Sequence, residues 1–518
     1  MQDSSHMVRH ALLMMMGTCV SRVLGLVREV VTAAFFGVSG QLDAFNVAYT
    51  LANLARQLVA EGALSAAFVP VFSKTLSDRR FDEAMNRARA LSLARQAMSV
   101  LIVASLTVTA LGILGAPFLT FLMAPGFDDA TSLLTTTLTR WMFPFLFLVS
   151  LAALAMGTLN SLGSFFVPSL APAFSNLIFI VTAPFFVGRF GVLGLTFSVL
   201  AGGALHFLSQ WLWGRRIGAT LFPQRPDFSD PDLRKMMALF LPYAAGLSLN
   251  QLNPVVSRML GSFLEEGSIS VLNYANRIVQ LPLGLFVIAI SQAVLPRLSS
   301  VREPEEFVSA MGDALRFALF IVLPAAVGLI AISEPFVHLI FVRGAFGEHA
   351  WRATSWALSL SVLGLPGMAC STVVMRGLYA LAMPRAAFAT TLFSVGCTAV
   401  LSFLLMFPMG YGGLALAPSV AFSLSGLVGL CRIRKKISRP LSVVSMNWVG
   451  RSVIALLLMT FVLRFYVFLL PYAPSAGLWP RASWCAGAML AGGSAYAAAT
   501  LAMKFDEWNW IKGAVRKE

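Results

Sequence analysis

Four arginines lie inside long apolar stretches of the sequence, where a charged side chain is costly. Arg22 and Arg28 fall in the first such stretch, Arg56 in the second and Arg277 in a later one. A charge at the centre of a membrane helix costs about 2.5–3.5 kcal/mol on insertion scales. A guanidinium stays charged at any cellular pH and binds phosphate oxygens in a bidentate manner. These arginines therefore predict that the protein has a polar cavity within the membrane and that this cavity binds an anionic ligand.

The alternative is that these arginines reach a membrane interface or pair with a nearby carboxylate. Arg22 and Arg56 lie too deep in their stretches for an easy reach to the surface. Arg28 is followed directly by Glu29, but sequence neighbours do not face each other on a helix. On an ideal helix, Arg22 and Arg28 share a broad side and lie about 9 Å apart along the axis. The pattern favours the cationic cavity.

Two carboxylates accompany the arginines in the stretch 21–70. Asp43 lies near one end of the second apolar segment, where it could gate the cavity or pair with an arginine. The alternative for Asp43 is an acid at a helix N-terminus, where it complements the helix dipole. Glu61, in the sequence AEGALS, could pair with Arg56 or with a residue of another helix. We assign Asp43 and Glu61 to gating or ion pairing.

The composition indicates what kind of element positions these residues. Of the 518 residues, 58% are hydrophobic and 12% are charged. Soluble domains average about 25% charged residues, and a soluble chain could not bury so much apolar surface. We therefore expect an all-α polytopic membrane protein.

The net charge of +15 would suggest nucleic acid as a partner of a soluble protein. Here the basic residues cluster in short gaps between apolar runs, so no nucleic-acid partner is expected.

About 14 segments are apolar and long enough to be transmembrane helices, since a span needs about 20 mostly apolar residues. Gaps on one side of the membrane hold clusters of Lys and Arg, whereas those on the other side hold few: Arg189, Arg343 and Arg481. This alternation places both termini in the cytoplasm. The segments are 10–37, 42–72, 92–123, 134–159, 168–187, 191–213, 236–263, 269–296, 307–333, 351–377, 386–407, 411–431, 447–470 and 482–503.

An internal repeat relates the first six segments to the next six. ALSAAFVP at 63–70 resembles AISQAVLP at 289–296, and GVLGLTFSV at 191–199 resembles GGLALAPSV at 412–420. These two matches have offsets of 226 and 221 residues, and the Pro-Phe pair at 117–118 recurs at 335–336 with an offset of 218. Six spans per repeat give both copies the same orientation, which predicts two six-helix lobes with a cavity between them. The predicted domains are an N-terminal lobe at 1–215, a C-terminal lobe at 216–440, and two additional helices with a cytoplasmic tail at 441–518.

Residues of the kind used in metal and redox chemistry are scattered. The five cysteines and five histidines do not have the spacing of a disulfide framework or of a metal site. The sequence has no GxxxxGK[ST] motif for nucleotide phosphates, and its longest gaps run to about 20 residues. We therefore expect no metal site, no cofactor and no enzymatic activity.

The stretches SRVLGLVRE, LDAFNVAY and AEGALSAAFVP are specific enough to suggest a family, and so are LMAPGF and NYANRIVQLPLGLFVIAISQAVLPRLS. They resemble the MurJ (MviN) lipid II flippases of bacterial peptidoglycan synthesis, over nearly the whole chain. The resemblance implies the fold of the MOP exporter superfamily, in which two lobes enclose a cationic central cavity. It also implies that the helices in 441–518 carry a groove for a polyprenyl tail.

The motifs of this family assign roles to particular residues of the chain. The arginines of its first-helix motif correspond to Arg22 and Arg28, and the acid of its xDAFxxA motif to Asp43. The arginine of NLxRxxxAEGA corresponds to Arg56, and that of YAxRxxxxP to Arg277. The resemblance therefore implies that these four arginines bind the substrate.

The chain departs from the family pattern at three positions. Family members often have a second arginine where this chain has Gln57, proline in place of Ala52, and aspartate in place of Asn276. No ion-pairing role is therefore expected for positions 57 and 276.

The resemblance implies a lipid II flippase that moves this polyprenyl-pyrophosphate-linked precursor from the cytoplasmic to the outer leaflet by alternating access. The head group would bind in the arginine-lined cavity. The expected partners are lipid II, membrane lipids and cell-wall synthesis enzymes, and the expected location is the bacterial cytoplasmic (inner) membrane. Alternatives on the same fold are exporters of another polyprenyl-linked glycan or of drugs, although a drug–cation antiporter should carry acidic cavity residues. A membrane enzyme acting on polyprenyl phosphates, or a non-transporting scaffold, is a further alternative.

Overall fold

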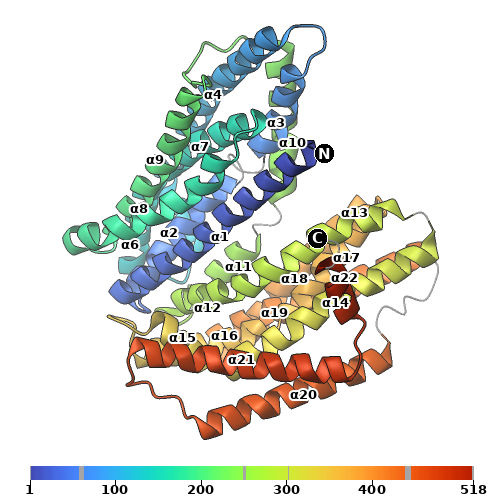
Figure 1. The fold of residues 1–518 in the computed structure, drawn as a ribbon. Helices are drawn as coiled ribbons and strands as arrows, with labels where there is room; N and C mark the ends of the chain where they lie inside the picture. Colours follow the sequence, from blue (N-terminus) through green and yellow to red (C-terminus); the bar gives the residue numbers. More distant parts are fainter. Residues whose placement is uncertain (1, 58–62, 249–251, 302, 438–444, 516–518) are drawn as a thin grey trace. The chain divides into compact units, whose positions relative to one another are not determined.

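The computed structural model describes residues 2–57, 63–248, 252–301, 303–437 and 445–515. Every regular element in these ranges is helical, which confirms the predicted all-α class. The chain forms two compact units, Met1–Gly267 and Ser268–Glu518 (Figure 1). Each unit is described by itself below.

The first unit is built around an apolar core among α3, α4, α7 and α10. Phe68 and Phe72 of α3 are fully buried there, against Leu93 of α4 and Leu154 of α7. α1 packs along α8, which packs along α9, and α2 packs on α6. The helices are α1 (Gln2–Phe36), α2 (Gly40–Arg56), α3 (Ala63–Leu76), α4 (Glu83–Leu114), α5 (Ala116–Met123), α6 (Asp129–Met142), α7 (Pro144–Ser161), α8 (Phe166–Phe190), α9 (Leu193–Arg216), α10 (Pro231–Ser248) and α11 (Leu252–Gly261).

The second unit contains a bundle and a helical hairpin, α20–α21, that packs on its helix α14. Apolar side chains of the hairpin meet Phe320 of α14, and the Tyr496 hydroxyl donates a hydrogen bond to the Phe320 carbonyl (3.0 Å). The elements are α12 (Ser268–Pro282), η3 (Leu283–Val287), α13 (Ile288–Ser300), α14 (Pro304–Ala331), α15 (Ser333–Phe341), α16 (Glu348–Val362), α17 (Leu365–Ala380), α18 (Pro384–Met409), α19 (Tyr411–Ile437), α20 (Met446–Leu469), α21 (Leu478–Ala502) and α22 (Glu507–Val515).

The helix order repeats between the units, as the sequence predicts. α4 to α9 form a long helix, a short helix, a divided helix and two long helices, and α14 to α19 follow the same order. α4 begins at Glu83 and α14 at Pro304, 221 residues later; α9 begins at Leu193 and α19 at Tyr411, 218 residues later. Among the described residues, the long helices α20 and α21 follow the second copy of this order, which agrees with two additional C-terminal helices.

Among the described residues, nine helices are long and apolar enough to cross a membrane, or ten if the bent pair α16 and α17 is one span. They match ten of the fourteen predicted segments, so the count of fourteen stays a prediction. The other four segments contain α1, α2 and α3, α10 and α11, and α12, η3 and α13. These are the first two segments of each repeat, and they carry the arginines of the predicted site. The segment 10–37 carries Arg22, Arg28 and Glu29, and in 269–296 Pro282 precedes the π-helical turn η3.

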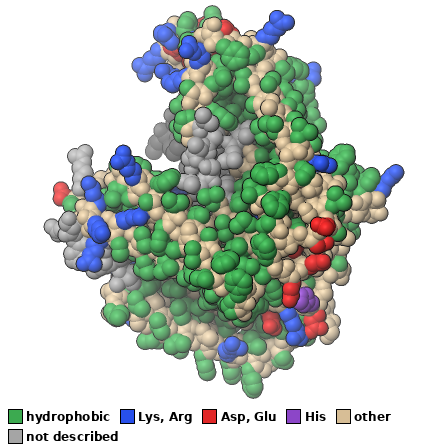
Figure 2. Space-filling model, turned by 180° about the vertical axis from the view of Figure 1, so that it is seen from behind, with side chains coloured by type: hydrophobic (Ala, Val, Ile, Leu, Met, Phe, Trp, Pro, Cys, Tyr) green, Lys and Arg blue, Asp and Glu red, His purple; other side chains and the backbone are tan. Residues whose placement is uncertain are grey.

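Large apolar side chains are exposed over both units, as expected where lipid is the solvent. Examples are Leu114, Phe185, Phe407 and Phe468, which lie on four of the long helices. Figure 2 shows hydrophobic side chains over most of the visible face. A soluble protein rarely exposes so much continuous apolar surface. The surface therefore supports a multi-pass membrane protein.

Candidate functional site

Arg28 is held by three helices of the first unit. On α1, its Nη2 lies 2.8 Å from Glu29 Oε1, and its Nη1 lies 3.5 Å from Asn176 Oδ1 of α8. Its guanidinium lies 5.6 Å from the ring centroids of Tyr49 on α2 and Phe179 on α8. The side chain is 20% exposed, and that of Glu29 is 10% exposed. Arg28 is therefore a fixed, mostly buried cation between aromatic faces.

The expectation that Glu29 does not pair with Arg28 is wrong. The two Cβ atoms point to different sides of α1, but both side chains are long enough for their ends to meet. This pair lowers the free energy of a charge in an apolar region. It also leaves other N–H groups of the guanidinium for a second acceptor, since the group has five.

Arg56 lies at the C-terminal end of α2 and is half-buried. Its Nε donates a hydrogen bond to Asn53 Oδ1 (2.8 Å), one turn earlier on the same helix. Tyr49 lies two turns before Arg56 and interacts electrostatically with both Arg28 and Arg56. His206 of α9, which sequence reasoning did not select, also lies within electrostatic range of Arg56. One face of α2 thus connects the two predicted arginines.

Asp43 lies at the other end of α2 and is buried. Its Oδ2 accepts a hydrogen bond from the backbone N–H of Gly267 (2.7 Å), the last residue of the first unit. Ser39 caps the helix, its side chain accepting a bond from Leu42 N (3.4 Å). Asp43 therefore joins the start of α2 to the segment that follows α11.

Arg258 of α11 is a site residue that the sequence analysis missed. Its Nε donates to Thr50 Oγ1 of α2 (3.4 Å), and the carboxylates that act electrostatically on it are Asp43 and Glu29. The criterion that selected the other arginines would also have selected Arg258, since this arginine interrupts the apolar segment 236–263. The structure therefore adds a cation to the polar face of α2.

The remaining predicted residues stand as follows. Arg22 is half-buried on α1. The residue before it, Ser21, accepts a hydrogen bond at its carbonyl from the side-chain amide of Asn176 (3.1 Å), the residue that also accepts from Arg28. Arg277 is half-buried on α12, in the second unit. Glu61 lies outside the described residues. The structure thus brings Arg28, Arg56 and Asp43 to α2, together with Arg258.

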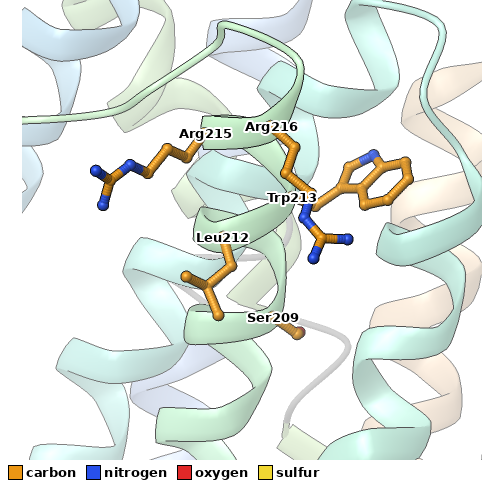
Figure 3. Close-up of a pocket in the computed structure, with 5 residues that line it drawn as sticks. All are labelled: Ser209, Leu212, Trp213, Arg215 and Arg216. Atoms are coloured by element: carbon orange, nitrogen blue, oxygen red, sulfur yellow. The ribbon is translucent and has the colours of Figure 1, made fainter.

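A second basic feature lies at the C-terminal end of α9. A pocket of about 520 Å³ is lined by Ser209, Leu212, Trp213, Arg215 and Arg216 (Figure 3). Trp213 Nε1 donates to Ser164 Oγ (2.8 Å), which fixes one wall. Both arginines lie in the last turn of α9, where a cation complements the helix dipole. This pocket is an exposed basic helix end, separate from the polar face of α2.

Comparison with known proteins identifies the family. The model of the family "Lipid II flippase MurJ" matches residues 32–476. The chain belongs to the MurJ family. The probable lipid II flippase MurJ of Rhizobium tropici is 33% identical over 416 residues, which cover 78% of this chain and 76% of that protein. The lipid II flippase MurJ of Burkholderia cenocepacia is 31% identical over 430 residues, which cover 81% and 82%.

Solved structures agree with the MurJ assignment. A lipid II flippase MurJ in an inward closed conformation has a TM-score of 0.77 and 27% identity, covering 94% of this chain and 98% of that chain. An inward-facing MATE family transporter of the MOP superfamily has a TM-score of 0.66 and 18% identity, covering 84% and 98%. This second likeness concerns the fold alone. The predicted family is therefore confirmed, and the fold is shared with a transporter of the MOP superfamily.

Proposed function

We propose that this protein is a lipid II flippase, which moves the polyprenyl-pyrophosphate-linked peptidoglycan precursor from the cytoplasmic to the outer leaflet. Membership of the MurJ family over most of the chain supports this function. The observation that carries the mechanism is Arg28, which is held mostly buried between α1, α2 and α8. We assign no catalytic step to the protein, because translocation makes and breaks no covalent bond.

The pyrophosphate of the substrate binds the arginines of the polar site. Arg28 and Arg56, with Arg22 on the same unit, offer guanidinium groups that match phosphate oxygens. Glu29 keeps Arg28 in place before the anion arrives, and Arg277 contributes from the second lobe. The site keeps the polar head group from crossing hydrocarbon without partners. The polyprenyl tail stays in lipid along α20 and α21, which expose many apolar side chains.

Movement of two lobes against each other exposes this site to each side in turn. In this proposal the lobes are 1–215 and 216–440, and 441–518 holds the tail groove and a cytoplasmic tail. Asp43 and Glu61 act in gating or ion pairing. Both termini lie in the cytoplasm, and the protein lies in the bacterial inner membrane. Phospholipids and cell-wall synthesis enzymes are its other partners.

Replacement of Arg28 tests this function. In a bacterium depleted of its own flippase, the wild-type chain should restore lipid II on the outer leaflet, and Arg28→Ala should restore less than about a tenth of it, because a lost charge-assisted bond is worth about 1.5–3 kcal/mol. The matched control is Arg352→Ala, whose side chain is 73% exposed and pairs with exposed Glu348.

Two results would contradict the proposal. The first is a wild-type chain that reaches the membrane at normal level and gives no rescue. The second is normal rescue by Arg28→Ala, which would remove the arginine mechanism while leaving the flippase assignment in place. Protein level in the membrane is measured in parallel, so that a folding defect is not read as a loss of transport.

A further inference from the structure

One end of the second unit carries two arginines that the charge pattern of the chain does not explain. Arg343 follows α15, and Arg481 lies in the first turn of α21. Both fall in gaps that the predicted topology places outside, where basic residues are few. α15 and α21 pack against each other, so residues from two outer gaps come together here (Figure 1).

Arg481 contacts a buried histidine of α15, and Arg343 lies within electrostatic range of Arg481. His338 Nδ1 lies 2.8 Å from the Tyr472 hydroxyl and 3.2 Å from Arg481 Nη1. A guanidinium can only donate, so Nδ1 accepts and the imidazole proton sits on Nε2. His338 is 5% exposed and therefore a neutral acceptor at the centre of the group. We call His338, Arg343, Tyr472 and Arg481 the His338 cluster.

The arginines of the His338 cluster have only neutral partners in the described part of the chain. Arg343 Nη2 donates to the Leu339 carbonyl (2.9 Å), and Arg481 Nε donates to the Gly477 carbonyl (3.3 Å). Partial burial, followed by the charge of Arg481, lowers the pKa of the exposed Arg343, and burial followed by the same charge lowers the pKa of His338. The cluster is thus a concentration of positive charge that a bound anion would stabilise.

Aromatic and apolar side chains frame the His338 cluster. The ring of Trp351 lies 4.7 Å from that of His338, and Trp484 lies 5.1 Å from Tyr472. Trp479 and Phe468 are 84% and 81% exposed. Tryptophan and tyrosine beside arginine are typical of the level of lipid headgroups. The setting therefore favours an anion that a lipid carries.

We propose that the His338 cluster binds a phosphate group at the outer surface of the membrane, from a phospholipid headgroup or from free phosphate. The outer location rests on the orientation given under the proposed function. Arg343 and Arg481 donate to the phosphate oxygens, and the exposed aromatic and apolar residues contact the glycerol and the first part of the acyl chains. The site is distinct from the polar face of α2, which belongs to the other unit.

Binding should tighten as the pH falls, because a bound anion favours the protonated form of His338. The other charged or titratable groups near His338 are Arg343, Tyr472 and Arg481, exposed Glu334 on α15, and Glu348, His349 and Arg352 on α16. Glu348 already pairs with Arg352 (2.6 Å). Burial raises the pKa of Tyr472 to about 12, so its hydroxyl stays a donor to His338.

The test measures binding of soluble probes to the full-length protein in a neutral detergent. The probes are dihexanoylphosphatidylglycerol and inorganic phosphate. Arg343→Gln/Arg481→Gln should weaken binding of the responding probe about tenfold or more, since about 1.4 kcal/mol corresponds to tenfold. Arg189→Gln is the matched control, because Arg189 is also exposed in a predicted outer gap but lies in the first unit. A response to the lipid alone identifies a headgroup, and equal affinity for both probes identifies free phosphate.

Several results would overturn this proposal: no saturable binding of either probe, unchanged affinity in the double variant, or an equal loss in Arg189→Gln. If the double variant does not fold, Arg343→Gln alone serves, since its side chain is exposed, and severalfold weaker binding is expected. With the lipid probe, whose phosphodiester does not titrate near neutral pH, His338→Asn should lose the pH dependence below the ordinary histidine pKa of about 6.5. The binding assay needs no transport, and the rescue of depleted cells by Arg343→Gln/Arg481→Gln is measured separately, so failure of this proposal and failure of the flippase proposal are distinguishable.

Discussion

At the scale of single residues, α2 is the element on which the polar groups converge. Asp43, Tyr49, Thr50 and Arg56 lie on this helix and interact with groups on α1, α9 and α11. The partners of α2 include Arg258, which comes from a segment about 200 residues later. The charge of Arg258 is balanced by Asp43 and Glu29, so a change in one group should alter the others.

We predict that Asp43 and Arg258 are energetically coupled. Asp43→Asn keeps an oxygen for the Gly267 N–H but removes the charge opposite Arg258, and Arg258→Gln removes the other charge. Each single variant should lower thermal stability in detergent. The double variant should be more stable than the sum of the single effects by about 0.5–3 kcal/mol, as expected of residues in one network. Strict additivity would show that the two charges act independently.

The long helices could be predicted from sequence because their apolar runs exceed the length of a span. Ten of the predicted segments coincide with such helices, and the repeat offset recurs in the helix order. The π-helical turn η3 that divides the segment 269–296 could not be predicted, because an apolar run looks the same whether a helix is continuous or divided. The pairing of Arg28 with Glu29 was missed for a related reason, since ideal helix geometry describes Cβ directions rather than the ends of long side chains.

At the scale of elements, Gly267 fixes the end of the first unit. Its φ is +86°, in the left-handed region, and a Cβ there would overlap with Val38 Cγ1. Gly267→Ala should therefore lower stability by about 1–3 kcal/mol, as overpacking does, and should disturb the bond to Asp43. The measurement is thermal unfolding of the purified protein. Gly347→Ala is the control, since no atom lies within 4 Å of its Cβ position. Equal stability of the two variants would contradict this account.

At the scale of the whole molecule, the distribution of charges along the chain and the order of the helices together predict the orientation of the protein in the membrane. Clusters of Lys and Arg fall in alternate gaps, and two of the three exceptions, Arg343 and Arg481, meet at one site. If the alternation reflects the positive-inside rule, the gap after α3 and the α20–α21 connection lie on opposite sides of the membrane. Between these two positions the predicted topology has eleven spans, an odd number.

Labelling of single cysteines checks this orientation. Ser77 follows α3 and Ser475 lies between α20 and α21, and both are exposed. In a background without the five native cysteines, Ser475→Cys should react with an impermeant maleimide in intact spheroplasts, and Ser77→Cys should react only after lysis. The opposite labelling pattern would show that the predicted orientation is reversed and that the His338 cluster lies on the cytoplasmic side of the membrane. Labelling of both positions in intact spheroplasts would instead mean that the predicted number of spans between them is wrong, because an even number returns the chain to the same side.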